Sequence, residues 1–333
     1  MESPKTLQQA MRFFNDEQVC IDTVAKMRWP KGPECPACGH KEHYYLKTQK
    51  RWKCKECYKQ FTVKLGTIFE DSPITLDKWL AALWMLVNCK NGISSYEIAS
   101  AFGISQKAGW FMLHRLRLAL QDGSVSKLGG SGEVEADETY VGAKARNMHL
   151  SRKIKLLKIR NEVPSRKLVG TSPGSMPGKT PVMGILDRET RKIRATVLPN
   201  IKRETLQSQI LGTVEHGSRL YTDQAVAYDG LSGKYAHEIV NHLEGYVNGR
   251  VHTNGLENFW SLLKRSLHGT YVAVEPFHLF RYVDEQAFRF NNRKDAAGNK
   301  LSASDRFNLA LSQVAGKRLT FAEVTGKAGA TSF

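Results

Sequence analysis

The stretch Gly132-Glu-Val-Glu-Ala-Asp-Glu-Thr-Tyr-Val-Gly142 decides how the larger part of the chain folds. Its β-branched and apolar residues predict a strand, yet Glu135, Asp137 and Glu138 place carboxylates where a buried strand is normally apolar. Two explanations fit: an edge strand whose acids face solvent, or a strand whose acids hold a divalent metal ion. Side chains alternate along a strand, so Glu135 and Asp137 share one face and Glu138 lies on the other.

The charge of the whole chain indicates a polyanionic partner. Among 333 residues, 49 Lys and Arg stand against 32 Asp and Glu, a net charge of +17. Such an excess causes self-repulsion unless a partner neutralises it, and nucleic acid is the expected partner. The apolar run at 79–87 is too short to cross a bilayer, and the N-terminus shows no secretory signal, so we expect a cytoplasmic, nucleoid-associated protein without a membrane partner.

Residues 31–66 carry the spacing of a zinc ribbon, preceded by a short helical lead-in at 1–30. Two CxxC pairs are separated by fifteen residues. Four thiolates suit a closed, tetrahedral and structural Zn²⁺ site, and cysteines in this pattern favour metal over disulfides. His40 and His43 are alternative ligands, expected to be bystanders beside a full cysteine set. The four predicted zinc ligands are Cys35, Cys38, Cys54 and Cys57.

Residues 72–122 have the pattern of a helix-turn-helix. Apolar residues recur at helical spacing after Thr75, a helix from 93 ends at Gly103, and Ser105 is placed to cap the next helix. In this motif the second helix enters the major groove of DNA. An ordinary helical hairpin is the alternative. The basic residues expected to contact DNA from the second helix are Lys107, Arg115 and Arg117.

The chain therefore reads as multidomain α+β, and residues 131–295 predict a mixed α/β sheet with helices on its faces. The order is a strand, a two-strand hairpin, a helix, two further strands and two long helices, which is the order of a ribonuclease-H-like domain. A basic insertion at 143–179 holds ten Lys and Arg against one Glu. We interpret it as an arm along a phosphate backbone, with a solubilising loop as the alternative. Residues 296–333 are left as a C-terminal tail.

Three acids stand where this order brings elements together: Asp137 in the first strand, Asp223 at the end of the fourth, and Glu257 in the first turn of the following helix. Parallel neighbouring strands place the two aspartates side by side. Carboxylates on a rigid scaffold suit Mg²⁺ (or Mn²⁺), and two ions about 4 Å apart suit in-line displacement at phosphorus. Each acid also has a plain explanation: a solvent-facing strand residue, a turn cap, or a capping box with Asn254.

Three motifs carry a resemblance to a known family. Glu135-Ala-Asp-Glu-Thr-Tyr-Val-Gly142, Tyr221-Thr-Asp223 and His252-Thr-Asn-Gly-Leu-Glu-Asn-Phe-Trp-Ser-Leu-Leu-Lys-Arg265 follow a four-cysteine ribbon. From about residue 15 to 292 the chain resembles bacterial insertion-sequence transposases with an ISXO-like DDE domain. The resemblance implies a metal-dependent transposase that binds terminal inverted repeats, exposes a 3′-hydroxyl and joins it to target DNA.

The same resemblance leaves the third metal ligand open. Family members vary at that position, where Asn can replace the acid and a Lys follows, so both Asn254 and Glu257 are candidates; we choose Glu257. Lys264 lies two helical turns after Glu257 on the same face, either to hold a phosphate or as a solvated lysine. The predicted catalytic residues are Asp137, Asp223, Glu257 and Lys264. Lys264 and Arg265 are predicted DNA contacts.

Two other functions remain open at this level. A regulator would bind DNA through the ribbon and helix-turn-helix without catalysis, and a nuclease of the same fold would cut DNA without joining it. Because both ends of an element must be handled together, we expect at least a homodimer on double-stranded DNA.

Overall fold

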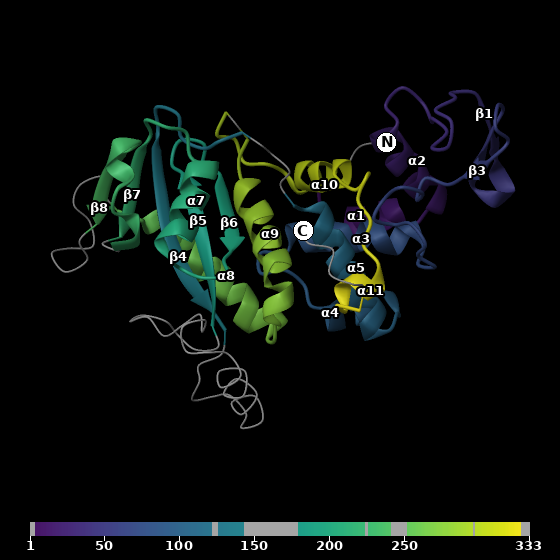
Figure 1. The fold of residues 1–333 in the computed structure, drawn as a ribbon. Coiled ribbons are helices and arrows are strands. Elements are labelled where there is room, and N and C mark those ends of the chain that lie inside the picture. Colours follow the sequence, from purple (N-terminus) through teal and green to yellow (C-terminus); the bar gives the residue numbers. More distant parts are fainter. Residues whose placement is uncertain are drawn as a thin grey trace. The chain divides into compact units, whose positions relative to one another are not determined.

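The computed structural model describes residues 4–121, 126–142, 179–223, 226–240, 252–295 and 297–327. The chain forms two compact units (Figure 1). The first joins the residues up to Asp122 with those from Asn292 onward, and the second holds Gly123–Asn291. The predicted basic insertion at 143–179 lies outside the described ranges except for Lys179. Within those ranges, none of the helices has the length and apolar character that a membrane crossing requires.

Two separate parts of the sequence build the helical core of the first unit. Phe307 packs its ring against Phe14 and Trp84, with ring centroids 5.2 and 5.5 Å apart. Arg306 donates to the side-chain oxygen of Asn88 at 3.0 Å. The segment left as a C-terminal tail is thus partly helical and packs on N-terminal helices. The helices are α1 (Leu7–Phe14), α2 (Glu17–Arg28), α3 (Leu76–Asn88), α10 (Ala303–Ser312) and α11 (Phe321–Val324).

The predicted pair of helices around Gly103 is present as α4 (Ser95–Phe102) and α5 (Gln106–Ala119). Gly103 has a φ of +59°, a left-handed conformation that glycine adopts without steric cost. The Ser105 side chain accepts the N–H of Ala108 at 3.2 Å, which confirms the predicted helix start.

The region between α2 and α3 forms a small antiparallel sheet in the order β1-β2-β3. Its strands are β1 (His43–Leu46), β2 (Arg51–Cys54) and β3 (Gln60–Phe61). The Trp52 ring is buried between Tyr45, Phe61 and Trp29, with centroids 5.0 to 6.0 Å away. This aromatic cluster gives a short three-stranded sheet a core of its own.

The second unit is built on a five-stranded mixed sheet in the order β6-β5-β4-β7-β8. The central strand β4 pairs antiparallel with β5 and parallel with β7. The acids of Glu135 to Glu138 therefore lie on a central strand, and the edge-strand explanation is wrong. The strands are β4 (Glu133–Val141), β5 (Thr180–Asp187), β6 (Ile193–Val197), β7 (Arg219–Asp223) and β8 (Ala236–Val240).

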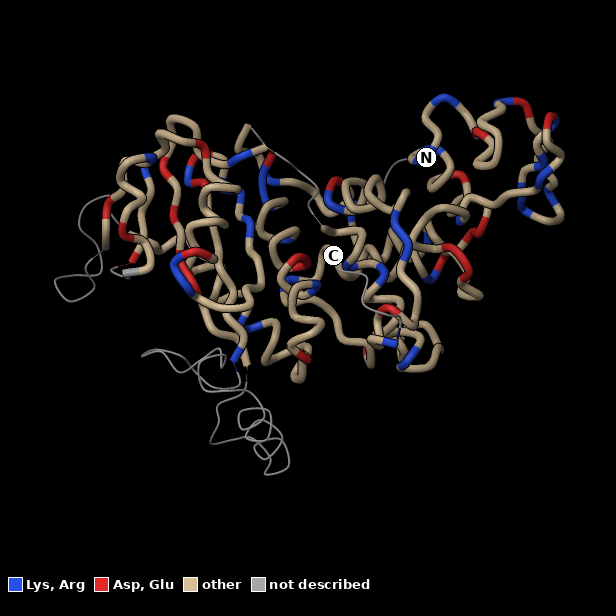
Figure 2. Tube along the Cα trace, in the orientation of Figure 1, with Lys and Arg blue, Asp and Glu red and all other residues tan. Residues whose placement is uncertain are grey.

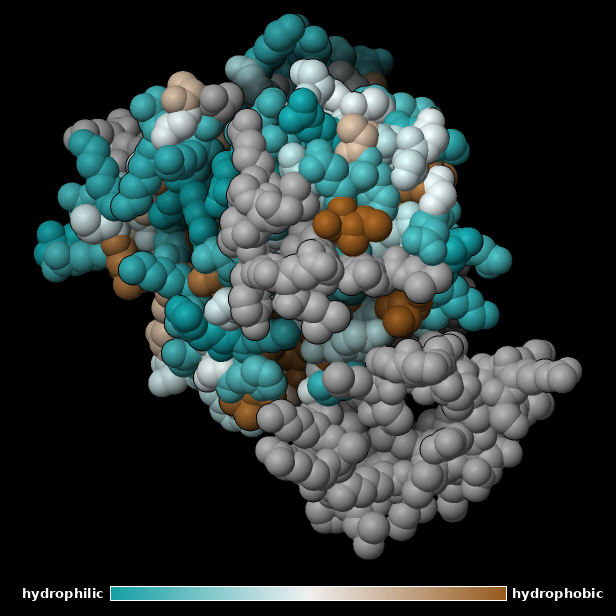
Figure 3. Space-filling model, turned by 90° about the vertical axis from the view of Figure 1, so that its left-hand side faces the viewer, coloured by the Kyte–Doolittle hydropathy of each residue, from teal (hydrophilic) through white to brown (hydrophobic). Residues whose placement is uncertain are grey.

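Helices cover both faces of this sheet (Figure 1). On one face, Val134 and Ala136 pack with Leu206 and Ile210 of α7 (Arg203–Thr213). On the other, Val182 and Leu186 pack with residues of α8 (Asn254–Ser266) and α9 (Leu279–Asn291), including Leu256 and Phe259. In the view of Figure 3 the described surface is mainly hydrophilic, with hydrophobic residues scattered rather than gathered.

Glycines allow α8 to approach the sheet closely. A Cβ at Gly184 of β5 would lie 2.8 Å from the side chains of both Leu256 and Trp260. A Cβ at Gly255 would lie 2.3 Å from Leu186 and 2.8 Å from a carboxylate oxygen of Glu135. Gly184 is the register partner of Asp137, so this contact brings α8 directly over the acid on the neighbouring strand.

We predict that Gly184→Ala destabilises the second unit by about 1–3 kcal/mol, because the added methyl group overpacks the contact with α8. The free energy of unfolding from urea denaturation measures the change. Gly212→Ala in α7 is the matched control, since nothing lies within 4 Å of its Cβ position. The control is expected to be neutral or stabilising by up to about 1 kcal/mol. Equal stabilities for the two variants would contradict the close approach.

Candidate active site and metal centre

The register of the sheet brings Asp137 and Asp223 level with each other. The parallel pairing of β4 with β7 ends at Glu135, which lies opposite Tyr221. Two residues further along each strand stand Asp137 and Asp223, and Asp223 is the last residue of β7. Because residues two apart share a face, both aspartates project from the same side as that pair.

Asp137 is a half-buried carboxyl with other acids near it. Burial together with the charges of Asp223 and Glu257 raises its pKa to about 6, against a hydrogen bond from Trp260 that lowers it. The indole Nε1 of Trp260 donates to Oδ2 of Asp137 at 2.9 Å. Charges from β7 and α8 thus both act on the acid of β4, as expected for acids arranged around a cation.

Glu257 lies in the first turn of α8, and its side chain is exposed. The N-cap of α8 is Thr253, with no side-chain hydrogen bond, and Asn254 is the first helical residue. The capping-box explanation of Glu257 is therefore wrong. Trp260 follows three residues later on the same helix face, and that residue already contacts Asp137. Lys264 and Arg265 are exposed further along the helix.

Glu138 projects from the opposite face of β4, as alternation predicts, and accepts a hydrogen bond from the Tyr228 hydroxyl. Burial, together with the charges of Asp223 and Asp137, raises the pKa of Glu138 to about 8. A fourth carboxyl therefore lies within electrostatic reach of the two aspartates. Sequence reasoning missed the Tyr228 contact, because that residue lies 90 positions from Glu138 along the chain.

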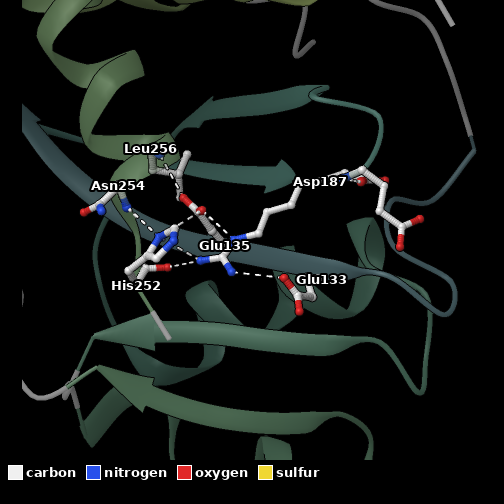
Figure 4. Close-up of polar contacts among 8 residues, drawn as sticks. Glu133, Glu135, Asp187, His252, Asn254 and Leu256 are labelled. Atoms are coloured by element: carbon white, nitrogen blue, oxygen red, sulfur yellow. Dashed lines mark hydrogen bonds and ion pairs between the residues drawn. The ribbon is translucent and has the colours of Figure 1, made fainter. Parts of the chain in front are cut away.

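Glu135 is committed to a different set of partners (Figure 4). Its side chain is only 1% exposed, and its carboxylate accepts Arg188 Nε at 2.7 Å and the backbone N–H of Leu256 at 3.0 Å. Glu135 is one of the three strand acids that could have held a metal ion. These contacts place it at the start of α8 instead. Sequence reasoning missed Arg188, since an arginine in a hairpin turn carries no local signal of a long-range partner.

Asp187 is the last residue of β5, and Glu189 lies in the turn that leads to β6. The buried carboxylate of Asp187 accepts the backbone N–H groups of Glu189 and Thr190 at 2.9 and 3.1 Å. A third N–H, from Gly129, lies 3.2 Å away. Turn geometry therefore accounts for this acid.

The four predicted zinc ligands come together. Their sulfur atoms all lie within 4.8 Å of one another, and the pairs Cys35–Cys57 and Cys38–Cys54 are 3.6 Å apart. A tetrahedron with metal–sulfur bonds of about 2.3 Å has edges of about 3.8 Å, so the quartet fits Zn²⁺. His40 and His43 are outside this group. In the described part of the chain, no other cluster of His, Cys, Asp or Glu is as tight.

The predicted DNA contacts on α5 differ in their exposure. Arg115 is 4% exposed, donates to the carbonyl of Glu70 and packs over the rings of Trp79 and Phe111. Arg117 is 1% exposed. Burial argues against a surface role for these two arginines, and we do not retain them as DNA contacts. Lys107 at the start of α5 is exposed, with its ammonium 4.6 Å from the ring centre of Phe321.

The raised pKa values of Asp137 and Glu138 predict a pH-dependent stability. Both acids hold protons in the folded state above their usual pKa values of 3.8 and 4.5. Their favourable contribution is complete below about pH 4 and is lost as the pH rises through about 6 and about 8. We predict that the stability of the metal-free protein falls less steeply between pH 5 and pH 8 in Glu138→Gln than in the parent.

Urea denaturation across that pH range measures this difference. Asp229→Asn, which changes an exposed acid of the same unit, is the control and is expected to keep the slope of the parent. A parental slope in Glu138→Gln would refute the assignment.

The cysteine geometry predicts one structural zinc ion per chain. Cys54→Ser is expected to lose the metal and the local fold of β1–β3, because a closed zinc site contributes directly to folding. Atomic absorption measures the zinc content. Cys89→Ser, at a cysteine outside the quartet, is expected to retain the metal, and zinc retained in Cys54→Ser would count against the site.

Comparisons with known proteins match both halves of the chain. The transposase zinc-ribbon domain matches residues 15–60, and the ISXO2-like transposase domain matches residues 128–291. An uncharacterized protein in transposable element ISH50 of Halobacterium salinarum is 28% identical over 266 residues, covering 77% of this chain and 85% of the relative.

A solved chain from the simian T-cell lymphotropic virus intasome in complex with PP2A regulatory subunit B56 gamma is also similar. It is 14% identical, with a TM-score of 0.24, over 56% of this chain. This protein spans 58% of the length of that chain, and a TM-score this low does not establish a shared fold.

The two matched domains stand in the order of the ribbon and the mixed sheet described above. The second match runs from before β4 to the last residue of α9 and so contains every acid of the candidate site. The chain belongs to the insertion-sequence transposases that carry an N-terminal zinc ribbon and an ISXO2-like DDE domain.

Proposed function

We propose that the protein is a DDE-type transposase that nicks the end of its element to expose a 3′-hydroxyl and joins that end to target DNA. Asp137, Asp223 and Glu257 would hold two Mg²⁺ (or Mn²⁺) ions in a ribonuclease-H-like domain. The observation that carries the proposal is the half-buried carboxyl of Asp137 on the central strand, on which the charges of acids from β7 and α8 both act. The strand order, with the central β4 between β5 and β7, supports the fold assignment.

The donor set fits such ions. Carboxylate oxygens are the ligands that Mg²⁺ prefers. Three carboxylates that hold two ions about 4 Å apart lie further from one another than four sulfur atoms around a single zinc ion. Bound metal would help to activate the attacking oxygen and to stabilise the leaving oxygen at phosphorus. Glu257 is preferred over Asn254 as the third ligand because its charge acts on Asp137.

The chain's own groups prepare this site. The Trp260 indole holds one oxygen of Asp137, which leaves the other carboxylate oxygen for a cation. Lys264 lies on an exposed position of α8 two turns beyond Glu257, where an ammonium would bind a phosphate of the DNA. Residues that move no proton but fix ligands in place contribute to the rate by preorganisation.

DNA binding is assigned to the first unit, on the zinc ribbon and the α4–α5 pair. The start of α5, with Lys107, is the exposed part of the second helix. Figure 2 shows positive and negative residues interspersed along both units. The insertion at 143–179 holds ten Lys and Arg against one Glu and so carries much of the excess positive charge of the chain. We assign this charge to contacts with a phosphate backbone. The proposed setting is a homodimer or larger assembly on DNA in the cytoplasm.

The test is cleavage and joining of a labelled element end in Mg²⁺. Removing a supporting partner of a metal ligand lowers activity roughly 10–100-fold. Asp137→Asn and Asp223→Asn remove proposed ligands themselves, so we expect a larger loss of cleavage and joining activity. Glu257→Gln and Asn254→Ala together identify the third ligand. Asp229→Asn is the control and is expected to keep full activity. Full activity in Asp137→Asn would overturn the proposal.

The same assay separates the alternatives. A non-catalytic regulator would bind the element end without metal-dependent cleavage in the parent protein. A nuclease would yield the nicked strand and no joined product. The transposase proposal requires both products, with joining dependent on the 3′-hydroxyl.

A further inference from the structure

Arg188 contacts the two strands that carry Asp137 and Asp223 and the segment that leads into α8, through residues other than the ligands themselves. It lies in the hairpin after β5, and its side chain is only 12% exposed. Figure 4 shows the cluster around Glu135, to which Glu133 and His252 also belong.

The first element is β4. Arg188 Nε donates to Glu135 at 2.7 Å, and Nη1 donates to Glu133 at 3.1 Å. Both glutamates share the strand face of Asp137, which follows Glu135 by two residues. A paired guanidinium therefore fixes the strand just before the ligand.

The second element is β7. The Arg188 guanidinium lies over the Tyr221 ring, 4.3 Å from its centre. Tyr221 is the register partner of Glu135, and Asp223 follows it by two residues. Arg188 thus contacts both strands at positions two residues before the aspartates, on the strand face that the aspartates share.

The third contact is with the segment that leads into α8. Arg188 Nη2 donates to the backbone carbonyl of His252, two residues before the helix, and lies 2.9 Å from His252 Nδ1. A guanidinium can only donate, so Nδ1 is the acceptor in this contact. Glu135 adds a second link by accepting the N–H of Leu256 at 3.0 Å. Glu257 is the next residue.

We infer that Arg188 is a positioning residue that sets the spacing of Asp137, Asp223 and Glu257 and thereby the affinity of the site for a divalent cation. The inference rests on the proposed function. Its physical basis is the planar guanidinium, whose five donors reach two glutamates and a carbonyl at once while its face stacks on an aromatic ring. Lysine has the charge but not this geometry.

Mn²⁺ serves as the probe, because its binding to the protein can be followed by electron paramagnetic resonance without any reaction. Arg188→Lys and Arg188→Gln are expected to bind Mn²⁺ about 10–100-fold more weakly than the parent, the range for loss of an outer partner of a metal site. Their cleavage of a labelled element end is expected to recover in part at high Mn²⁺. Arg191→Gln, an exposed arginine of the same hairpin, is the matched control and should leave Mn²⁺ affinity unchanged.

The melting temperature of each variant separates positioning from general stability. Parental Mn²⁺ affinity in a folded Arg188→Lys or Arg188→Gln would overturn the inference. Loss of fold in both would also overturn it, in favour of a purely structural role. Failure of the proposed function is distinguishable, because it appears as full cleavage activity in Asp137→Asn, whatever the Arg188 variants show.

Discussion

The buried charge of Glu135 is the constraint on which the second unit depends. An ionised carboxylate with 1% exposure is tolerated only when hydrogen bonds and an opposite charge compensate its lost hydration. Arg188 and the N–H of Leu256 supply that compensation, so the first turn of α8 must begin against β4. The positive end of the helix dipole adds to the effect. Gly255 makes the approach possible, since any side chain there would meet the carboxylate.

Glu135 and Asp137, on one face of β4, consequently have different surroundings. Glu135 is neutralised by a cation of the protein, whereas Asp137 accepts an indole N–H and a backbone N–H and lies near further acids. The first arrangement fixes structure. The second leaves negative charge concentrated where α8, β4 and β7 meet, and an external cation is the natural counterpart of such a cluster. The same helix contact serves both, because Trp260 reaches Asp137 only when Leu256 is held at Glu135.

Local sequence patterns predicted the helices, strands and caps well, but they did not predict contacts between residues that are distant along the chain. The cysteine spacing, the turn at Gly103 and the Ser105 cap are local, and each has the expected structure. The order of strands was enough to place Asp137 near Asp223. The commitment of Glu135 to Arg188 depends on residues 53 positions apart, for which the sequence offers no period or motif. Arg115 was misjudged for a related reason, since helical spacing shows which residues share a face but not what later packs on it.

The residues from Asn292 onward belong to the first unit, so that unit can be completed only late in synthesis. Phe307 completes a core begun by Phe14 and Trp84, and Lys317 donates to the carbonyls of Leu118 and Ala119 at the end of α5 at 3.1 and 3.2 Å. These partners emerge from the ribosome only after the whole sheet and α9 have been made. The mixed sheet can therefore form while the earlier helices still wait for α10. A nascent chain that stops before residue 303 would hold every acid of the candidate site but leave the N-terminal helices with part of their core exposed.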